Sequence, residues 1–375
     1  MISYPAGDFP AWSALAGVKR LSGDFNNDGL TDYALVGGPG WNTIPVAMSN
    51  GNGQFTITNQ YVGLDFNGWA QTANVTALPA DFNHDGFTDI ALVGGGGWGS
   101  IPVAFNTGNG NFSITNTIIG SFAGWAATPG ARPLVGDFNK DGFADIALVG
   151  GAGWSTLPVA FSYGNGNFQI TNANVSGIVF VGTSFYGCNF ATSAQAANVQ
   201  AVTGDFNKDG YTDIALVGGA NWSTINVALN RGNGNFGCHE DINVPNFGAW
   251  AASPGAKVFA GDFNKDGYTD LALTGVAGWA SIPIAFSIGF GNFSVTNGYV
   301  GSFGGWASTP GVRIIAGDYN GDGYTDFALT GPAWASIPVA FNTGYGNFSV
   351  TNNLVTNFPT WATDATASVF SGHVD

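Results

Sequence analysis

Asp24-Phe25-Asn26-Asn27-Asp28-Gly29-Leu30-Thr31-Asp32 is the first of six copies of one nine-residue pattern, D-F/Y-N-x-D-G-x-x-D. The other copies begin at Asp81, Asp137, Asp205, Asp262 and Asp318. Each copy places Asp or Asn at positions 1, 3, 5 and 9, and Gly at position 6, where a sharp turn needs glycine. Together with the backbone carbonyl of position 7, this spacing predicts a calcium loop, because Ca²⁺ takes many oxygen ligands in a flexible geometry.

The six copies predict about six Ca²⁺, one per loop, with five ligands each. The predicted metal ligands are Asp24, Asn26, Asp28, Leu30 and Asp32; Asp81, Asn83, Asp85, Phe87 and Asp89; Asp137, Asn139, Asp141, Phe143 and Asp145; Asp205, Asn207, Asp209, Tyr211 and Asp213; Asp262, Asn264, Asp266, Tyr268 and Asp270; and Asp318, Asn320, Asp322, Tyr324 and Asp326. An EF-hand is excluded, because its loop has Glu at position 12, where the first copy has Leu35. The alternative is an Asx-rich turn without metal.

The loops explain most of the acidity of the chain. The net charge is −15 over 375 residues, and three Asp in each of six loops supply 18 of the 24 acidic residues. Six bound Ca²⁺ would leave about −3. With nine Lys and Arg there is no basic patch for nucleic acid, and no apolar run has membrane-spanning length. We expect a soluble protein, secreted or released without a classical signal peptide, since residues 1–10 lack that pattern.

The spacing of the loops reveals a repeat of about 56 residues, because successive copies start 57, 56, 68, 57 and 56 residues apart. Each repeat holds four short apolar or alternating segments bounded by Gly, Asn and Pro, which is typical of strands and turns. Repeats of a β-solenoid, the alternative, are usually shorter. We therefore predict an all-β, six-bladed β-propeller over residues 1–375, with a calcium-binding A–B loop in each four-stranded antiparallel blade. The predicted blades span about 13–65, 66–121, 122–189, 190–246, 247–302 and 303–357.

Residues 358–375 are predicted to be a closing tail. Phe358-Pro-Thr-Trp361 copies the first connector, Phe9-Pro-Ala-Trp12, and Ser368-Val-Phe-Ser-Gly372 copies an innermost strand. His373 then stands where a loop Asp would begin, so this copy has no cation loop. We expect the tail to latch the ring beside the N-terminal segment.

The fourth repeat is irregular. Its connector is expanded between Asn172 and Phe190, and Ser193 replaces the connector Trp. Cys188 and Cys238, the two cysteines of the chain, both belong to this repeat, which favours a disulfide that pins the insertion. Two buried free thiols and an intermolecular bridge are the alternatives.

Strand parity places the A–B and C–D loops on one face of the disc and the B–C and D–A loops on the other. All 12 Trp fall in loops of this second face, where an indole can stack on the apolar face of a sugar while amides and hydroxyls bond its hydroxyl groups. The candidate carbohydrate-binding residues are Trp41, Trp98, Trp154, Trp222, Trp279 and Trp334 in the B–C loops, and Trp69, Trp125, Trp250 and Trp306 in the connectors. The alternative is a wedge between blades, which we favour for the connector Trp and disfavour for the others.

A hydrogen-bond donor stands five residues before each loop, at the start of the innermost strand. Four of the six are basic, and these are further candidate carbohydrate-binding residues: Lys19, Arg132, Lys257 and Arg313. The alternative is that they cap strand ends or offset the acidic loops. No catalytic arrangement is apparent, because none of the three His recurs and no nucleophile elbow, HExxH or phosphate loop occurs. We predict that the protein is not an enzyme.

The loops and runs such as Phe122-Ala-Gly-Trp125 and Ile101-Pro-Val-Ala-Phe105 resemble the FG-GAP repeats of integrin α-chain propellers. More closely, the whole chain resembles mushroom lectins built on that fold, particularly the oyster mushroom type. This resemblance implies sugar binding at equivalent sites between blades, with galactose or N-acetylgalactosamine as the ligand. The related velutina-type propellers would imply N-acetylglucosamine or sialic acid.

The resulting hypothesis is a calcium-dependent, multivalent lectin that binds glycans of glycoproteins or glycolipids and agglutinates erythrocytes. Neither nucleic acid nor membrane insertion is expected, and a homodimer or higher oligomer is possible. The competing hypothesis is an integrin-like platform for protein binding, whose partners sugars would not displace. In the first case several weak sites on one rigid ring would add up to useful avidity.

Overall fold

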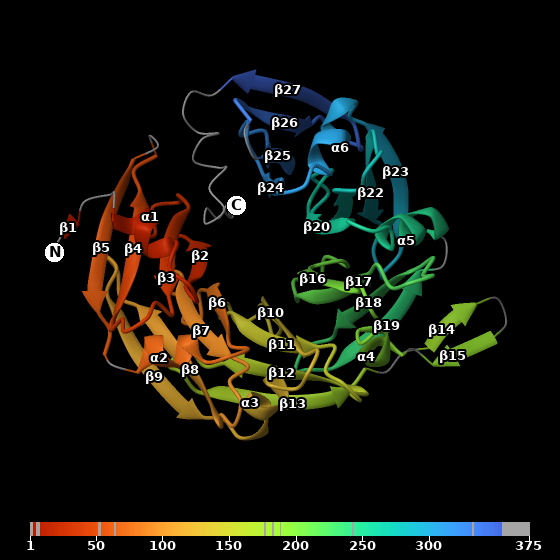
Figure 1. The fold of residues 1–375 in the computed structure, drawn as a ribbon. Coiled ribbons are helices and arrows are strands. Elements are labelled where there is room, and N and C mark those ends of the chain that lie inside the picture. Colours follow the sequence, from red (N-terminus) through yellow and green to blue (C-terminus); the bar gives the residue numbers. More distant parts are fainter. Residues whose placement is uncertain are drawn as a thin grey trace.

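The computed structural model describes residues 3–4, 8–51, 54–63, 65–175, 178–181, 184–187, 189–241, 244–331 and 334–354. Within them, six antiparallel sheets of four consecutive strands surround a central axis (Figure 1), which confirms the predicted six-bladed β-propeller. The strands of each blade follow chain order from the centre outwards, and β1 adds a fifth, outermost strand to the first blade by pairing with β5.

The blades are formed by the following strands. Blade 1 has β1 (Ser3–Tyr4), β2 (Lys19–Gly23), β3 (Asp32–Val36), β4 (Thr43–Ser49) and β5 (Phe55–Tyr61); blade 2 has β6 (Thr76–Ala80), β7 (Asp89–Val93), β8 (Ser100–Asn106) and β9 (Phe112–Ile118); blade 3 has β10 (Arg132–Gly136), β11 (Asp145–Val149), β12 (Thr156–Ser162) and β13 (Phe168–Asn174). Blade 4 has β16 (Gln200–Gly204), β17 (Asp213–Val217), β18 (Ile225–Asn230) and β19 (Phe236–Asp241); blade 5 has β20 (Lys257–Gly261), β21 (Asp270–Thr274), β22 (Ser281–Ser287) and β23 (Phe293–Tyr299); blade 6 has β24 (Arg313–Gly317), β25 (Asp326–Thr330), β26 (Ser336–Asn342) and β27 (Phe348–Leu354).

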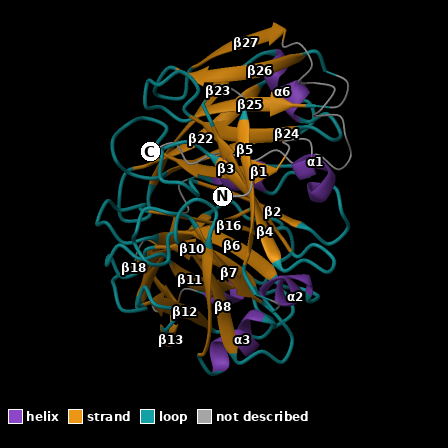
Figure 2. Ribbon diagram, turned by 90° about the vertical axis from the view of Figure 1, so that its left-hand side faces the viewer, coloured by secondary structure: helices purple, strands orange, loops and turns teal. Residues whose placement is uncertain are grey.

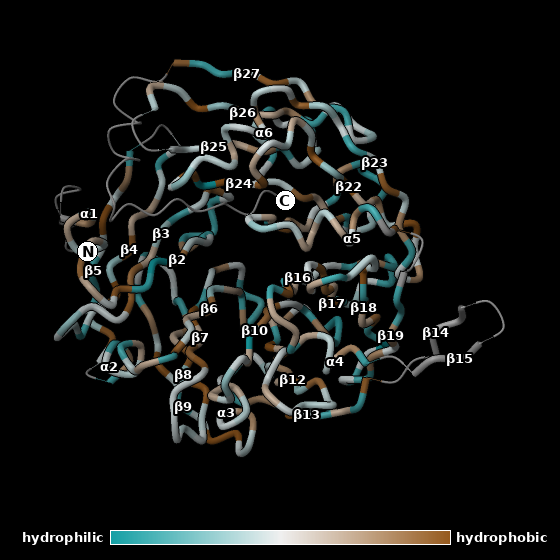
Figure 3. Tube along the Cα trace, turned by 45° about the vertical axis from the view of Figure 1, so that its right-hand side comes forward, coloured by the Kyte–Doolittle hydropathy of each residue, from teal (hydrophilic) through white to brown (hydrophobic). Residues whose placement is uncertain are grey.

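Burial follows the position of a strand within its blade. In the second strand a run of apolar residues follows the first Asp, as in Asp145-Ile-Ala-Leu-Val149. Every residue of β7, β11 and β17 is buried because neighbouring blades cover both faces of the strand. Outer strands such as β23 and β27 show alternating hydrophobic and hydrophilic segments (Figure 3), as expected where one side faces solvent.

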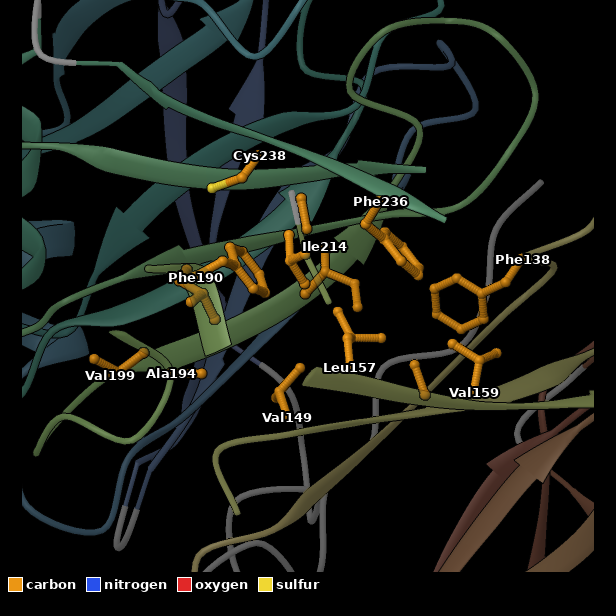
Figure 4. Packing of buried hydrophobic residues seen from close by; sticks show 14 of the residues in the cluster. Phe138, Val149, Leu157, Val159, Phe190, Ala194, Val199, Ile214, Phe236 and Cys238 are labelled. Atoms are coloured by element: carbon orange, nitrogen blue, oxygen red, sulfur yellow. The ribbon is translucent and has the colours of Figure 1, made fainter. Parts of the chain in front are cut away.

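The hydrophobic core lies between blades. The Phe at loop position 2 is fully buried in blades 1 to 5 and, at four junctions, meets the first Phe of the next blade's outer strand edge to face. Figure 4 shows one such pair, Phe138 of blade 3 and Phe236 of blade 4, whose ring centroids are 6.2 Å apart. In blades 1 to 5 the loop is therefore anchored by an aromatic ring inside the core, and at the four junctions with a ring pair this couples the loop to the packing of the next blade.

The connectors between blades are short helices, and the prediction that their Trp lie in loops was wrong. Figure 2 shows labelled helices along one side of the disc. Phe, Trp and Ala at spacings i, i+3 and i+4, as at Phe122, Trp125 and Ala126, place their side chains on one side of a helical turn facing the core. The helices are α1 (Asp8–Ser13), α2 (Phe66–Gln71), α3 (Ser121–Ala126), α4 (Phe190–Ser193), α5 (Pro245–Ala251) and α6 (Ser302–Ala307).

The insertion in the fourth repeat forms a separate two-stranded sheet of β14 (Ile178–Val181) and β15 (Ser184–Gly187), which projects outside the ring in Figure 1. Cys238 is buried at the edge of the core between blades 3 and 4, and no free cysteine is found in the described part of the chain. Cys188 and the closing tail 358–375 lie outside the described residues. The disulfide and the latching of the tail therefore stay predictions.

Candidate functional site

Each B–C loop ends in a tight turn that positions its Trp. In blade 3 the N–H of Trp154 donates to the carbonyl of Gly151 at 3.2 Å, and Gly153 between them has a φ of 78°, which glycine adopts without strain. The indole lies back over Gly151, since a Cβ built there would fall 2.2 Å from the ring. The same N–H bond and the same placement of the ring over the glycine recur in blades 1, 2, 4 and 6 at Trp41, Trp98, Trp222 and Trp334. The G-x-x-W sequence thus fixes the ring.

The connector helix of the next blade supports this turn from the other side. In blade 4 the Gln195 amide donates to the carbonyl of Trp154 at 2.7 Å and accepts from the N–H of Gly153 at 2.8 Å. In the helix α5, Gly248 lies so close to Ser223 that an added Cβ would fall 2.5 Å from its carbonyl carbon. The connectors therefore lie between the B–C turns of successive blades.

The two kinds of Trp come together at four of the blade junctions. All 11 Trp in the described residues are half-buried, and a connector Trp shares a core cluster with the B–C Trp of the same blade. The pairs are Trp69 with Trp98, Trp125 with Trp154, Trp250 with Trp279 and Trp306 with Trp334. In blade 4, Trp222 has no such partner, because Ser193 takes the connector position. One part of each indole packs between blades while another part remains accessible.

A pocket of about 170 Å³ lies between α5 and the outer strand β23. Trp250 and Phe247 supply aromatic lining, and Asn246, Thr296 and Asn297 supply amide and hydroxyl groups. Both asparagines are exposed, so their amides can reach a bound molecule.

Of these lining residues, sequence reasoning identified Trp250 but missed Asn246, Thr296 and Asn297. A signal was present, because a Thr-Asn dipeptide recurs at the same register in five of the six outer strands. The copies are Thr58-Asn59, Thr115-Asn116, Thr171-Asn172, Thr296-Asn297 and Thr351-Asn352. Blade 4 has His239-Glu240 there, as well as Ser193 for Trp.

Side chains at the start of three innermost strands donate hydrogen bonds to the connector of the following blade. Lys19 donates to the carbonyl of Ala70, Arg132 to that of Ala194 at 2.7 Å, and Gln200 to that of Ala256 at 2.9 Å. Burial lowers the pKa of Lys19 and of Arg132 from their ordinary values. These bonds favour the strand-capping interpretation for Lys19 and Arg132, whereas the side chain of Lys257 is exposed.

The first seven residues of every loop form one repeated hydrogen-bond pattern on the opposite face. In loop 2, the carboxylate of Asp81 accepts from the N–H groups of Asp85 and Gly86, and Asp85 accepts from the N–H of Phe87. The side chains at positions 3 and 5 converge in all six loops, where the amide of the Asn and the carboxylate of the Asp are 2.7–2.9 Å apart. In loop 1 the buried Oδ1 of Asn26 has no hydrogen-bond partner.

The Asp at position 9 differs in burial and in hydrogen bonding from the Asp residues at positions 1 and 5 of the same loop. In loop 3, Asp145 is fully buried, with one oxygen accepting from the N–H of Phe138 at 2.9 Å and the other from that of Ser162 at 2.8 Å. All six loops share this pattern, which ties the A–B loop to the end of the third strand. Burial, reinforced by the neighbouring loop carboxylates, raises the pKa to about 8 in blades 2 to 5 and to about 6 in blades 1 and 6.

This geometry fits a hard cation on one side of the loop. Within the described residues, no group of three or more His, Cys, Asp or Glu is close enough to hold a metal ion, because position 9 is turned into the fold. Positions 1, 3 and 5 nevertheless bring two carboxylates and an amide together, and the orphaned Asn26 oxygen calls for a partner that attracts oxygen. Carboxylate and amide oxygens are ligands of the kind that a hard cation such as Ca²⁺ takes.

The comparisons identify the repeat. A model of the FG-GAP-like repeat matches residues 24–92, 81–148 and 205–273, more than half of the chain, so the protein belongs to the FG-GAP-like repeat family. No curated protein matches the sequence. Among the described helices none is long and apolar enough to cross a membrane.

Among solved structures, the chain is similar to an Agrocybe aegerita lectin that specifically recognises non-reducing terminal N-acetylglucosamine. The two are 24% identical with a TM-score of 0.67, over 89% of this chain and 79% of the lectin, which establishes a common fold. Weaker similarities are to the Photorhabdus luminescens Tc holotoxin pore (13% identity, TM-score 0.47, 91% of this chain and 15% of that one) and to AofleA of Arthrobotrys oligospora (12%, 0.46, 92% and 88%).

Proposed function

We propose that the protein is a multivalent, non-catalytic lectin whose sugar sites lie between the blades on the Trp face. The observation that carries this proposal is the pocket beside Trp250, in which an aromatic ring stands next to two exposed asparagine amides. Such a combination stacks on the apolar face of a sugar and bonds its hydroxyl groups. The fold shared with the Agrocybe aegerita lectin supports it.

We further propose terminal N-acetylglucosamine as the first sugar to test and galactose or N-acetylgalactosamine as the second. The Agrocybe aegerita lectin recognises terminal N-acetylglucosamine. Galactose and N-acetylgalactosamine are implied by the resemblance of the sequence to oyster mushroom lectins. Sites of equivalent construction are proposed at the connectors with Trp12, Trp69, Trp125, Trp250 and Trp306. Blade 4 is the altered site, because Ser193 removes the ring and Glu240 adds a charge.

Calcium is proposed to hold the loops on the opposite face, with Asp and Asn of positions 1, 3 and 5 and the carbonyl of position 7 as ligands. Since these loops lie across the disc from the Trp, we assign Ca²⁺ a structural role. Its removal would weaken sugar binding through loss of blade order rather than through loss of a direct contact.

A glycan array and erythrocyte agglutination in the presence of Ca²⁺ test the function. We expect binding that free N-acetylglucosamine or galactose inhibits at millimolar concentration, as suits weak sites combined by avidity. An array without any bound glycan would refute the lectin. Binding to cells that no sugar displaces would instead support the integrin-like platform.

Replacement of Asn246 and Asn297 by Ala is expected to remove the blade 5 site without harming the fold, because both side chains are exposed. Titration calorimetry should show one site fewer per chain and an unchanged affinity at the remaining sites. Ser294→Ala, an exposed change on the same strand outside the pocket, is the matched control. A stoichiometry equal to that of the unaltered protein would rule out this pocket as a sugar site.

A further inference from the structure

The residue at position 4 of a cation loop reaches the loop of the next blade. In loop 3 this residue is Lys140, whose Nζ donates to the carbonyl of Asp209 in loop 4 at 2.8 Å. Lys208 of loop 4 donates in the same way to the carbonyl of Asp266 in loop 5. Each of these bonds joins position 4 of one loop to position 5 of the next, so the contacts run in one direction around the disc.

The same neighbour relation holds where position 4 is not lysine. At five junctions, a Cβ built on the glycine at position 6 would fall within 3.0 Å of the position 4 side chain of the preceding loop. The side chains are Asn27, His84, Lys140, Lys208 and Lys265, and the glycines are Gly86, Gly142, Gly210, Gly267 and Gly323. Position 4 of loop 6 is Gly321, which has no side chain. Loops 4, 5 and 6 therefore receive a lysine from the preceding blade, and loops 1, 2 and 3 do not.

The residue at position 7 changes together with the residue that reaches it. Where the preceding loop supplies Lys, position 7 is Tyr; where it supplies Asn27 or His84, position 7 is Phe. An ammonium within about 6 Å of the centroid of an aromatic ring is attracted to its face. The Nζ atoms of Lys140, Lys208 and Lys265 lie 5.8, 5.6 and 3.9 Å from the ring centroids of Tyr211, Tyr268 and Tyr324. The three lysines are thus held in place although their side chains are exposed.

Lysine is an unexpected residue at position 4. Lys140, Lys208 and Lys265 have φ angles of 61–62°, in the left-handed region that Gly and Asn adopt more readily than other residues. Asn27 and Gly321, at the same position, fit this backbone better. Three lysines against the local preference indicate that their contacts with the next loop offset the strain.

The lysine charge lies beside a proposed cation site. The carboxylate of Asp209 is a proposed calcium ligand and bonds the amide of Asn207 at 2.8 Å, while the carbonyl of Asp209 accepts from Lys140. A positive charge there stabilises the ionised carboxylates of the calcium-free loop. It also repels a divalent cation that binds to them. Both effects lower the calcium affinity of the loop that receives the lysine.

We propose that Lys140, Lys208 and Lys265 are built-in counter-ions of loops 4, 5 and 6. The chain then has two classes of cation site: three in loops 1 to 3 that bind Ca²⁺ more tightly, and three in loops 4 to 6 that bind it more weakly and depend on it less. This inference rests on the proposed calcium loops and is independent of the sugar.

Titration of Ca²⁺ into the calcium-free protein at pH 8, in competition with a chromophoric chelator, counts the two classes. We expect three tighter and three weaker sites per chain, about three- to tenfold apart in affinity, as suits one exposed charge beside a divalent ion. Lys208→Met keeps the aliphatic chain and should move one site to the tighter class, and the Met variant of all three lysines should move three. Lys208→Arg keeps the charge and should leave the two classes as in the wild type.

Transfer of the lysine to another junction tests the same assignment in the opposite direction. His84→Lys with Phe143→Tyr gives loop 3 the pair found at loops 4 to 6, and should leave two tighter and four weaker sites. A uniform shift of all sites in any variant would show an effect of net charge alone and would overturn the proposal. Six equal sites that no variant changes would overturn it while leaving calcium binding in place. Absence of Ca²⁺ binding in every protein would refute the calcium loops and this proposal together.

Melting gives a second readout that does not require bound calcium. In EDTA at pH 8 the Met variant of all three lysines should melt about 1–4 °C lower than the wild type, because three loops lose their counter-ion. In saturating Ca²⁺ the difference should disappear, since the cation takes the place of the lysine charge. The Arg variant of all three lysines should melt as the wild type does in both conditions. An equal loss in EDTA and in Ca²⁺ would show that the lysines act through packing and not through charge.

Discussion

Removal of calcium is expected to lower the melting temperature by about 15–23 °C at pH 8 and by much less at pH 5. If six sites each contribute on the order of 2–3 kcal/mol at saturating Ca²⁺, their sum divided by the unfolding entropy of a chain this long gives a shift of this size. Calcium is expected to stabilise the protein because each loop, when no cation is bound, holds three carboxylates within nine residues.

The pH dependence follows from the carboxyl at position 9. In the metal-free fold its pKa is raised to about 8 in four blades, against about 4 in an unfolded chain. The folded state then binds more protons than the unfolded state between pH 4 and pH 8, so the stability of the metal-free protein falls as the pH rises through this range. Calcium favours ionised carboxylates, and its contribution grows over the same range.

Differential scanning calorimetry in Ca²⁺ and in EDTA, at pH 5 and pH 8, measures both effects. Mg²⁺ is the control ion, because it demands a tight octahedral site and should restore little of the lost stability. Equal melting temperatures with and without EDTA at pH 8 would contradict the calcium assignment. A calcium effect that does not grow with pH would contradict the proposed linkage between bound Ca²⁺ and the ionisation of the position 9 carboxyls.

The fold can be predicted from the sequence because residues that favour turns separate the strands of every repeat. Gly, Asn and Pro mark each turn, and the apolar runs between them leave one arrangement of four strands. The metal ligands are less predictable, since D-x-N-x-D-G-x-x-D does not show that Asp145 turns away to serve two backbone N–H groups. That orientation depends on Ser162, a residue of the third strand brought there by sheet pairing.

The candidate sugar site also contains one residue that the sequence predicts and others that it does not. Trp250 stands out in a sequence because its ring is large and recurs, whereas Asn246 and Asn297 are ordinary polar residues until α5 and β23 are packed together. Asn246 and Asn297 are 51 positions apart in the chain, which hides the pocket from sequence analysis. The connector helices were missed because six residues with two glycines, as in Ser302–Ala307, have low intrinsic helix propensity, and burial of Phe303 stabilises the turn instead.

Asp145→Asn is expected to destabilise the protein even in the absence of calcium. Asp145 is fully buried and accepts one backbone N–H with each oxygen. An asparagine can accept only one of these bonds and turns its own amide hydrogens towards the other N–H, which leaves a buried donor unsatisfied. The cost is about 1–3 kcal/mol for that group, with more from donor–donor repulsion. Asp145→Leu loses both acceptors and should cost about twice as much.

The matched control is Asp141→Asn, four residues earlier in the same loop, where the side chain is exposed and bonds the N–H of Phe143 and the amide of Asn139. Melting should be measured in EDTA and in Ca²⁺ at pH 8.5, where the wild-type carboxyl, with its pKa of about 8, is mostly ionised. We expect Asp145→Asn to melt about 1–4 °C lower in EDTA, and Asp141→Asn to melt as the wild type does in EDTA but to gain less from Ca²⁺. If both variants instead lose stability only in Ca²⁺, position 9 is a metal ligand first and a structural acceptor second, and the division of labour within the loop must be reversed.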